Sequence, residues 1–332
     1  MSILIRKAAY FDEFRCIGGS CPDSCCKEWD VQVDGESAAR YRRLPGALGD
    51  KLRSVLKDVD GETLMQAEKG RCPMWREDGL CRIQAELGEQ ALCHTCREFP
   101  RIRHDYGDFI ELGLELSCPE AAKLILRRHD GFVSLEQSGE ESGDYDREVM
   151  DILLNSREEL RLILNDDKYK IPERLAIALM YAYHVQALLD GEDMEDFDRA
   201  SALEQAKAFA ADGSEANVIA YLSELEILSP QWEAQLSKPA GDVWRREHIL
   251  LAEYFMDRYW LQTISDLDLV CRAKFMLISC LAVKLIGGDI FVTAQRYCKE
   301  IENNMDNVEA LLDAAYSYPA FTDNRLLGLI LN

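Results

Sequence analysis

The chain has 332 residues, 48% of them hydrophobic and 30% charged, with only 9 Pro and 20 Gly, which excludes a disordered or collagen-like protein. The 60 Asp and Glu outnumber the 38 Lys and Arg, and the net charge of -22 argues against nucleic acid and anionic membranes as partners. Most of this acidity lies in residues 131–332, which hold 37 acidic and 18 basic residues. We interpret it as a hydrated surface, with attraction of a cationic segment of a protein substrate as the alternative.

The first third of the chain mixes strand, helix and loop patterns. Hydrophobic residues alternate at 28–33 and 109–116, which predicts two short strands. Between them, 37–59 and 83–97 have the spacing of helices, the first interrupted by a Pro-Gly pair. Residues 69–81 contain Gly and Pro at intervals typical of a loop that could present ligands.

The rest of the chain is predicted to be helical. Pro119 stands where the first turn of a helix accepts proline. The helices expected after it, separated by Gly or Pro, are 144–165, 172–190, 197–211, 216–228, 242–264, 268–287, 290–303, 307–316 and 322–331. We therefore predict a mainly α fold, in which a small cysteine-rich metal-binding region with short β-strands (1–130) precedes an acidic, all-helical, multi-helix C-terminal domain (131–332).

The N-terminal segment gives no sign of export. Arg6 and Lys7 interrupt the region where a signal peptide needs an unbroken apolar stretch. The most apolar later segment, 275–287, contains Lys284 and is too short to span a bilayer, so no membrane association is expected. We therefore expect a cytoplasmic protein, in which thiols stay reduced.

Twelve cysteines are a large number for such a compartment. A dense group of reduced thiols indicates metal binding or redox chemistry rather than disulfides. Nine of them lie in the first 118 residues, namely Cys16, Cys21, Cys25, Cys26, Cys72, Cys81, Cys93, Cys96 and Cys118. The other three, Cys271, Cys280 and Cys298, fall in apolar helices, where we expect them to pack as small hydrophobic residues.

The spacing of the nine cysteines leaves the kind of metal open. Several thiolates that meet at one point favour zinc or an iron–sulfur cluster. A C-x3-C-x2-C motif is absent because position 28 is Glu, and only Cys93 and Cys96 supply the C-x2-C pair that a zinc ribbon needs twice. The ligands expected first are Cys16, Cys21, one of Cys25 and Cys26, and Cys96, followed by Cys72 and Cys81.

Two segments resemble the flagellin lysine-N-methylase family, FliB, within a wider group of CxxCxxCC cysteine-cluster proteins. They read FRCIGGSCPDSCCKEWDVQVD at 14–34 and CPMWREDGLCRIQAELGEQALCHTCREFPR at 72–101. The cysteines at motif positions are Cys16, Cys21, Cys25, Cys26, Cys72, Cys81, Cys96 and Cys118, and Cys93 falls in the same block. Beyond residue 118 the resemblance is mainly one of helical character.

The resemblance implies an enzyme that transfers a methyl group from S-adenosylmethionine to surface lysine side chains of flagellin, its protein partner. It also implies a 4Fe-4S cluster bound by the motif cysteines, with zinc as the alternative because the wider group chelates either metal. No G-x-G-x-x-G turn is present to bind S-adenosylmethionine, and Gly18–Gly19 is only a weak candidate. The sequence assigns no catalytic residue.

Two other functions remain open at this point. A non-catalytic binding protein folded around structural zinc would have four closed thiolate ligands, no colour and no methyl transfer. An iron–sulfur electron-transfer protein would instead be coloured and would need a surface on which a redox partner docks.

Overall fold

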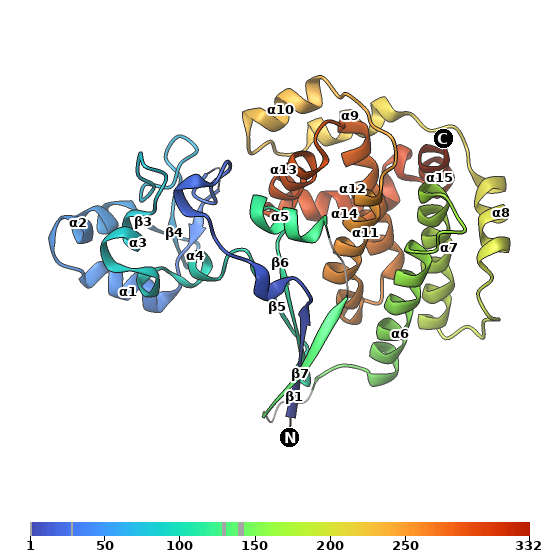
Figure 1. Ribbon diagram of the computed structural model, residues 1–332, viewed down its shortest axis with the longest axis horizontal. Helices are drawn as coiled ribbons and strands as arrows, with labels where there is room; N and C mark the ends of the chain where they lie inside the picture. Colours follow the sequence, from blue (N-terminus) through green and yellow to red (C-terminus); the bar gives the residue numbers. More distant parts are fainter. Residues whose placement is uncertain (1, 28, 128–130, 139–142) are drawn as a thin grey trace.

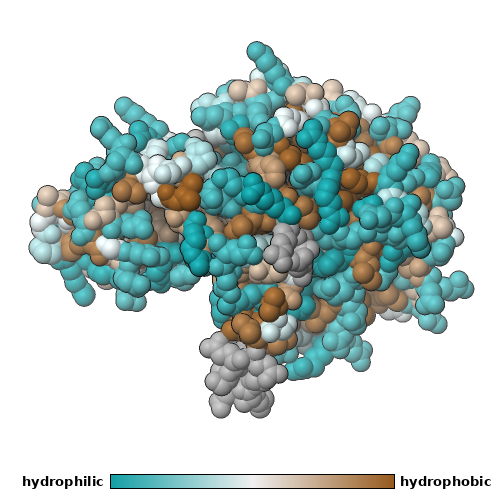
Figure 2. All heavy atoms as spheres, in the orientation of Figure 1, coloured by the Kyte–Doolittle hydropathy of each residue, from teal (hydrophilic) through white to brown (hydrophobic). Residues whose placement is uncertain are grey.

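The structure is a computed structural model that describes residues 2–27, 29–127, 131–138 and 143–332. A small lobe stands beside a larger body, and a sheet lies at the junction between them (Figure 1). Within the described residues there are 15 α-helices and two small sheets, so the predicted mainly α fold is confirmed. In the view of Figure 2, hydrophilic side chains cover most of the surface of both parts.

The small part, which we call the cysteine-rich lobe (residues 16–99), combines short helices with a three-stranded sheet of order β2-β4-β3. Its elements are η2 (Gly18–Ser20), β2 (Val31–Gln32), α1 (Gly35–Arg43), α2 (Gly46–Val55), β3 (Leu56–Val59), β4 (Glu62–Met65), α3 (Arg82–Leu87), η3 (Glu89–Ala91) and α4 (His94–Glu98). Tyr41, Leu52 and Met74 form its core together with two buried thiols, Cys72 and Cys93.

The lobe differs from the sequence prediction in three places. The helix predicted at 37–59 divides into α1 and α2 at the Pro-Gly pair, as predicted, but its last part forms β3, because Asp60 and Gly61 adopt positive φ and turn the chain into a β-hairpin. The helix predicted at 83–97 is divided at Gly88, whose φ is +85°. Of the strand predicted at 28–33, only β2 forms, and Glu28 lies outside the described residues.

Asp34 connects two helices of the lobe. Its carboxylate caps α1 by accepting a hydrogen bond from the Ser37 N–H at 2.9 Å, and it accepts another from the His94 N–H of α4 at 2.8 Å. Partial burial opposes ionisation, but these two hydrogen bonds outweigh it and lower the pKa of Asp34 to about 2. The stabilisation is therefore complete above the ordinary pKa of 3.8 and is lost as the pH falls toward 2.

Replacing Asp34 with alanine should therefore destabilise the protein mainly at neutral pH. We expect a loss of about 1 kcal/mol in the free energy of unfolding, the usual cost of removing a helix N-cap. Urea unfolding of the wild type and of Asp34→Ala at several pH values measures this difference. It should shrink below pH 3.8 as the wild-type carboxylate becomes protonated, and a constant difference would contradict the assignment.

The sheet at the junction has the strand order β5-β6-β1-β7. Its strands are β1 (Ser2–Ala8), β5 (Arg101–Asp105), β6 (Phe109–Leu114) and β7 (Phe132–Ser138). Strand β1 runs parallel to β6, while the other neighbours are antiparallel. Helix η1 (Phe11–Glu13) follows β1 and leads toward Cys16, and β6 leads toward Cys118. The chain segments on either side of the cysteine-rich lobe therefore both belong to this sheet.

The helical body (residues 119–127 and 147–332) packs around α12 (Leu269–Ile286), which is buried along nearly its whole length. The other α-helices are α5 (Pro119–Ile125), α6 (Arg147–Leu164), α7 (Ile171–Leu189), α8 (Arg199–Phe209), α9 (Glu215–Glu224), α10 (Pro230–Ser237), α11 (Arg246–Tyr259), α13 (Ile290–Glu302), α14 (Met305–Ser317) and α15 (Asp323–Leu331), with short 3-10 turns at η4 (Trp260–Ser265) and η5 (Pro319–Phe321). No described helix is long and apolar enough to cross a membrane.

Hydrophobic packing divides the chain into two cores. One core uses residues between Val31 and Cys96 and belongs to the cysteine-rich lobe. The other core joins the junction sheet to the helical body. Phe109 of the sheet and Ile125 of α5 therefore pack with the helices that follow. The division of the chain at residue 130 into two domains stays a prediction, since packing alone does not show which segments fold independently.

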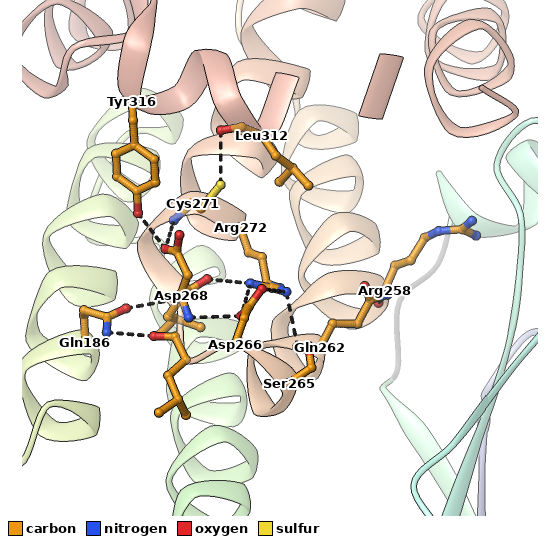
Figure 3. A network of polar contacts seen from close by, with 12 residues as sticks. Gln186, Arg258, Gln262, Ser265, Asp266, Asp268, Cys271, Arg272, Leu312 and Tyr316 are labelled. Carbon is orange, nitrogen blue, oxygen red and sulfur yellow. Dashed lines mark hydrogen bonds and ion pairs between the residues drawn. The ribbon is translucent and has the colours of Figure 1, made fainter. Parts of the chain in front are cut away.

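The turn between η4 and α12 fixes the end of α11 (Figure 3). Leu267 has a φ of +61°, and Arg272 binds both carboxylate oxygens of Asp266, at 2.9 and 2.8 Å. Arg272 also donates to the backbone oxygen of Gln262 at 3.3 Å, and the Gln262 side chain donates to the backbone oxygen of Arg258 at 2.9 Å. The side chain of Arg258 points away from this turn toward the strands (Figure 3), so the turn helps to set its position.

Candidate thiol site

The backbone of the cysteine-rich lobe brings two cysteine segments together. The Cys72 N–H donates to the backbone oxygen of Cys26 at 2.8 Å, and Lys27 and Arg71 form an antiparallel bridge beside them. A second bridge, between Trp75 and Cys81, folds the loop back on itself. Cys26, Cys72 and Cys81 therefore come to one region, although as many as 55 residues separate them in sequence.

Three thiols interact in this region. The neighbouring thiols of Cys25 and Cys72 lower the pKa of Cys26. Interaction with Cys26, together with burial, raises the pKa values of Cys25 and Cys72, and the Cys72 thiol donates to the Met65 sulfur at 3.6 Å. Cys26 is therefore the thiol of the three that loses its proton most readily, and the thiolate is the form that binds metals.

The C-x2-C pair adds two more sulfurs. Cys93 is the N-cap residue of α4, and Cys96 lies in the first turn of the same helix. Interaction with the Cys96 thiol lowers the pKa of Cys93 to about 7. Burial raises the pKa of Cys81, and the charges of Cys26 and Cys93 raise it further.

A second group of thiols lies toward the helical body. Cys118 is the N-cap residue of α5, and burial raises its pKa to about 11, with further contributions from Cys21 and Cys16. The Cys21 thiol donates to the backbone oxygen of Asp23 at 3.1 Å. The charges of Cys16 and Cys118 also raise the pKa of Cys25.

The arrangement falls short of a formed metal cage. Among the described residues, no three or more His, Cys, Asp or Glu side chains are placed so that they could hold a metal ion. The donor chemistry still suits a soft metal, because the pKa of Cys26 is lowered and the thiols of Cys72 and Cys93 are buried among apolar side chains. The ligand assignment thus stays a prediction: Cys16 and Cys21 belong to one group of sulfurs and Cys96 to the other.

A partly buried ion pair joins the cysteine loop to the helical body. The Lys299 amino group of α13 lies 2.9 and 3.0 Å from the two carboxylate oxygens of Asp23. The Gln295 side chain donates to the same carboxylate at 3.0 Å and to the backbone oxygen of Ser117 at 2.7 Å. Lys299 and Gln295 are each only 5% exposed. Sequence analysis did not find this contact, because Asp23 and Lys299 are 276 residues apart and no local pattern connects them.

The three cysteines of the C-terminal helices are packed as expected. Cys271, Cys280 and Cys298 are buried in the hydrophobic core of the helical body. Burial raises the pKa of Cys271 to about 12, so this thiol keeps its proton. These residues therefore serve as internal controls for the thiols of the lobe.

Replacing Cys280 with alanine should cost little stability. Its side chain is fully buried in α12, where it donates a weak hydrogen bond to the His248 backbone oxygen at 3.5 Å. Loss of one buried sulfur should lower the free energy of unfolding by about 1 kcal/mol, a typical value for a small core truncation. Urea unfolding measures this change, and metal content should be the same as in the wild type. A loss of bound metal in Cys280→Ala would contradict its structural role.

Comparison with known proteins identifies the relatives of this chain. The flagellar biosynthetic protein FliU of Salmonella muenchen is 34% identical over 138 residues, which cover 39% of this chain and 80% of FliU. The lysine-N-methylases of Salmonella typhimurium and Salmonella choleraesuis are each 32% identical over 146 residues, which cover 41% of this chain and 36% of each enzyme. The matched region thus spans little more than a third of the length of these two enzymes.

These similarities define the family. A flagellar protein and two lysine methylases align with this chain over similar lengths, 138 residues for the first and 146 for the other two. The chain belongs to the FliB family of lysine-N-methylases, which includes FliU. No protein-family model matches the chain, and no solved structure matches it.

Proposed function

We propose that the chain transfers methyl groups from S-adenosylmethionine to surface lysine side chains of flagellin, and that this activity depends on a 4Fe-4S cluster. The observation that carries the proposal is the 32% identity with two proteins named lysine-N-methylase. The convergence of thiols around Cys26 supports the cluster, because a thiolate among further thiols is the donor set that iron–sulfur clusters use.

Methyl transfer requires that the protein bind the lysine with its amine uncharged. When bound, S-adenosylmethionine supplies an electrophilic methyl group on its sulfonium sulfur. The lone pair of the lysine nitrogen forms the new N–C bond while the C–S bond breaks, and the thioether leaves with that electron pair. The proton of the methylated ammonium passes to solvent. A lysine with its ordinary pKa near 10.4 is protonated at neutral pH, so the site must favour the neutral amine.

The cluster ligands are proposed from the thiols at motif positions. They are Cys16, Cys21, Cys25, Cys26, Cys72, Cys81, Cys96 and Cys118. Cys26 is the strongest candidate, since the neighbouring thiols of Cys25 and Cys72 lower its pKa. Zinc is the alternative metal, because the same ligands bind it. A reducing cytoplasm is the proposed location, since it keeps these thiols free to bind metal.

Methyl transfer to purified flagellin tests the proposal. The chain is purified without oxygen and incubated with flagellin and S-adenosylmethionine, and the intact mass of flagellin is measured. We expect the mass to rise by whole methyl groups, and flagellin whose lysines have been acetylated beforehand should gain none. If flagellin gains no mass although the chain contains iron, the methylase proposal is wrong and electron transfer is favoured. A colourless zinc protein without methyl transfer would instead favour the non-catalytic binding protein.

A further inference from the structure

A narrow, half-open cavity lies between the junction sheet and α11. Its volume is about 30 Å³, which accommodates the end of a side chain but is far below the several hundred Å³ that a nucleoside needs. Its walls include Ala8, Ile102 and Phe132 from the sheet, and His104 and Arg258 contribute polar groups. The cavity therefore combines an apolar wall with a small number of hydrogen-bonding groups.

Gly113 of β6 lines this cavity, and its backbone conformation does not require a glycine. It does not adopt the positive φ that favours glycine, and a Cβ built on it would meet no atom within 4 Å. Glycine weakens a strand because it adds conformational entropy and no packing, and inside a strand it often marks the close approach of a ligand. The missing side chain at Gly113 leaves space that any larger residue would fill.

The carboxylates of the cavity are already neutralised by arginines. Glu111 accepts two hydrogen bonds from Arg157, at 2.8 and 2.6 Å, and Asp257 accepts one from Arg161 at 2.5 Å. Arg258 itself lies 2.8 Å from a carboxylate oxygen of Glu302 and reaches the cavity wall. The charged groups at the cavity wall are therefore paired with one another, and Arg258 also lies 3.8 Å from Glu115.

His104 offers a neutral hydrogen-bonding group in the same place. It is half-buried on β5, opposite Glu111 in the sheet. Burial and the nearby guanidinium of Arg258 lower the pKa of His104 to about 4, so its imidazole is uncharged at neutral pH. A neutral imidazole has one nitrogen that accepts a hydrogen bond. Such a nitrogen can orient an uncharged amine without stabilising its protonated form.

We propose that this cavity receives the ε-amino end of a lysine side chain in its uncharged form. The apolar walls suit the methylene stem, the small volume suits the amine, and the His104 imidazole offers a nitrogen that can accept a hydrogen bond from the uncharged amine. The assignment of this cavity as the methyl-acceptor site rests on the proposed function. The cavity is too small for S-adenosylmethionine, so the donor would have to approach from its open side.

The position of the cavity is consistent with this role. Tyr254 of α11 lines it and accepts a hydrogen bond from the Leu116 N–H at 3.3 Å, two residues before Cys118. Tyr10 also lines it and lies six residues before Cys16. The cavity therefore lies where the chain enters and leaves the cysteine-rich lobe.

Binding of n-butylamine, which mimics a lysine side chain, tests the cavity without methyl transfer. Resonances of the His104 imidazole are followed by NMR as n-butylamine is added to the full chain. Gly113→Val should weaken binding by about tenfold or more, because its side chain occupies the cavity. Gly35→Val is the matched control, since a Cβ at this exposed glycine of α1 also meets no atom within 4 Å. It should bind n-butylamine as the wild type does.

The outcomes separate this inference from the proposed function. Equal n-butylamine binding by the wild type and Gly113→Val, or no binding by either, would overturn the cavity assignment. If Gly113→Val does not fold, Gly113→Ala adds a single methyl group to the same space and gives a smaller loss in the same direction. If folded Gly113→Val methylates flagellin at the wild-type rate, the cavity is not the acceptor site, while the methylase function stands. If the chain binds n-butylamine in the cavity but never methylates flagellin, the cavity binds an amine and the methylase function is wrong.

Discussion

Replacement of Cys26 by alanine is expected to remove bound metal and to destabilise the cysteine-rich lobe. Cys26 has a lowered pKa, and its backbone oxygen accepts from the Cys72 N–H at 2.8 Å, so it is the thiol best placed to bind metal where the two cysteine segments meet. Structural metals supply about 10 kcal/mol or more to small domains, because the binding energy is also folding energy. We expect the metal content to fall by about tenfold or more, and the lobe to become sensitive to proteolysis.

Two measurements on the same preparations check this expectation. Elemental analysis gives the metal bound per chain, and limited proteolysis followed by mass spectrometry locates the first cleavages. Cys280→Ala is the control, because it removes a thiol from the helical body and should keep both the metal and the resistant lobe. If Cys26→Ala retains its metal, Cys26 is not a ligand and the proposed set must be revised.

Replacement of Arg157 by methionine should be the most destabilising change in the helical body. The Arg157 side chain is fully buried, and it makes two hydrogen bonds to Glu111, which is 3% exposed. Removing Arg157 leaves a buried carboxylate whose remaining arginine, Arg6, is 3.3 Å away. Breaking a buried pair in this way costs about 3–5 kcal/mol, because one charge stays without adequate compensation.

Urea unfolding of three variants tests this explanation. Arg103→Met breaks an exposed ion pair with Asp105 on the same sheet and should cost less than about 1 kcal/mol. The double variant Glu111→Gln with Arg157→Met removes both charges and should regain part of the loss. If Arg157→Met is as stable as Arg103→Met, the buried pair does not stabilise the fold as described.

The sequence predicted most of the helical body because its helices carry local signals. In α12 and α13, Asp268 and Asp289 are N-cap residues, and Gly287 ends the first of these helices. The predicted helix 242–264 is shorter in the structure, where α11 ends at Tyr259 and continues as a 3-10 turn. Helix α10 was not predicted, although Ser229 and Pro230 are a recognisable start.

Of the junction sheet, the strand predicted at 109–116 forms β6, but the pairing of the strands could not be predicted from local patterns. Strand β1 pairs in parallel with β6, whose residues lie about a hundred positions later, for example Leu4 with Phe109. Such a pairing leaves no short-range signal, and β7 occurs in a stretch that was expected to be helical. The hairpin at Asp60 and Gly61 did have a signal, since Asp-Gly is a favoured two-residue turn.

The sequence predicted the kind of site, a cluster of reduced thiols, but not how its residues are arranged in space. Reduced, closely spaced cysteines indicated a metal or redox site, because that inference depends only on residue type and spacing. The contact between Asp23 and Lys299, and the space beside Gly113, depend on how distant segments pack. Tertiary packing therefore decides which thiols meet and where a substrate side chain could enter.

X-ray absorption at the iron and zinc edges tests the central claim most directly. The chain is purified without oxygen, and the element bound and its nearest neighbours are read from the spectra. We expect iron with sulfur neighbours and a second shell of iron, and we expect Cys26→Ala to lose this signal while Cys280→Ala keeps it. Zinc in place of iron, or an absence of both metals in the folded chain, would show that the thiols do not hold an iron–sulfur cluster.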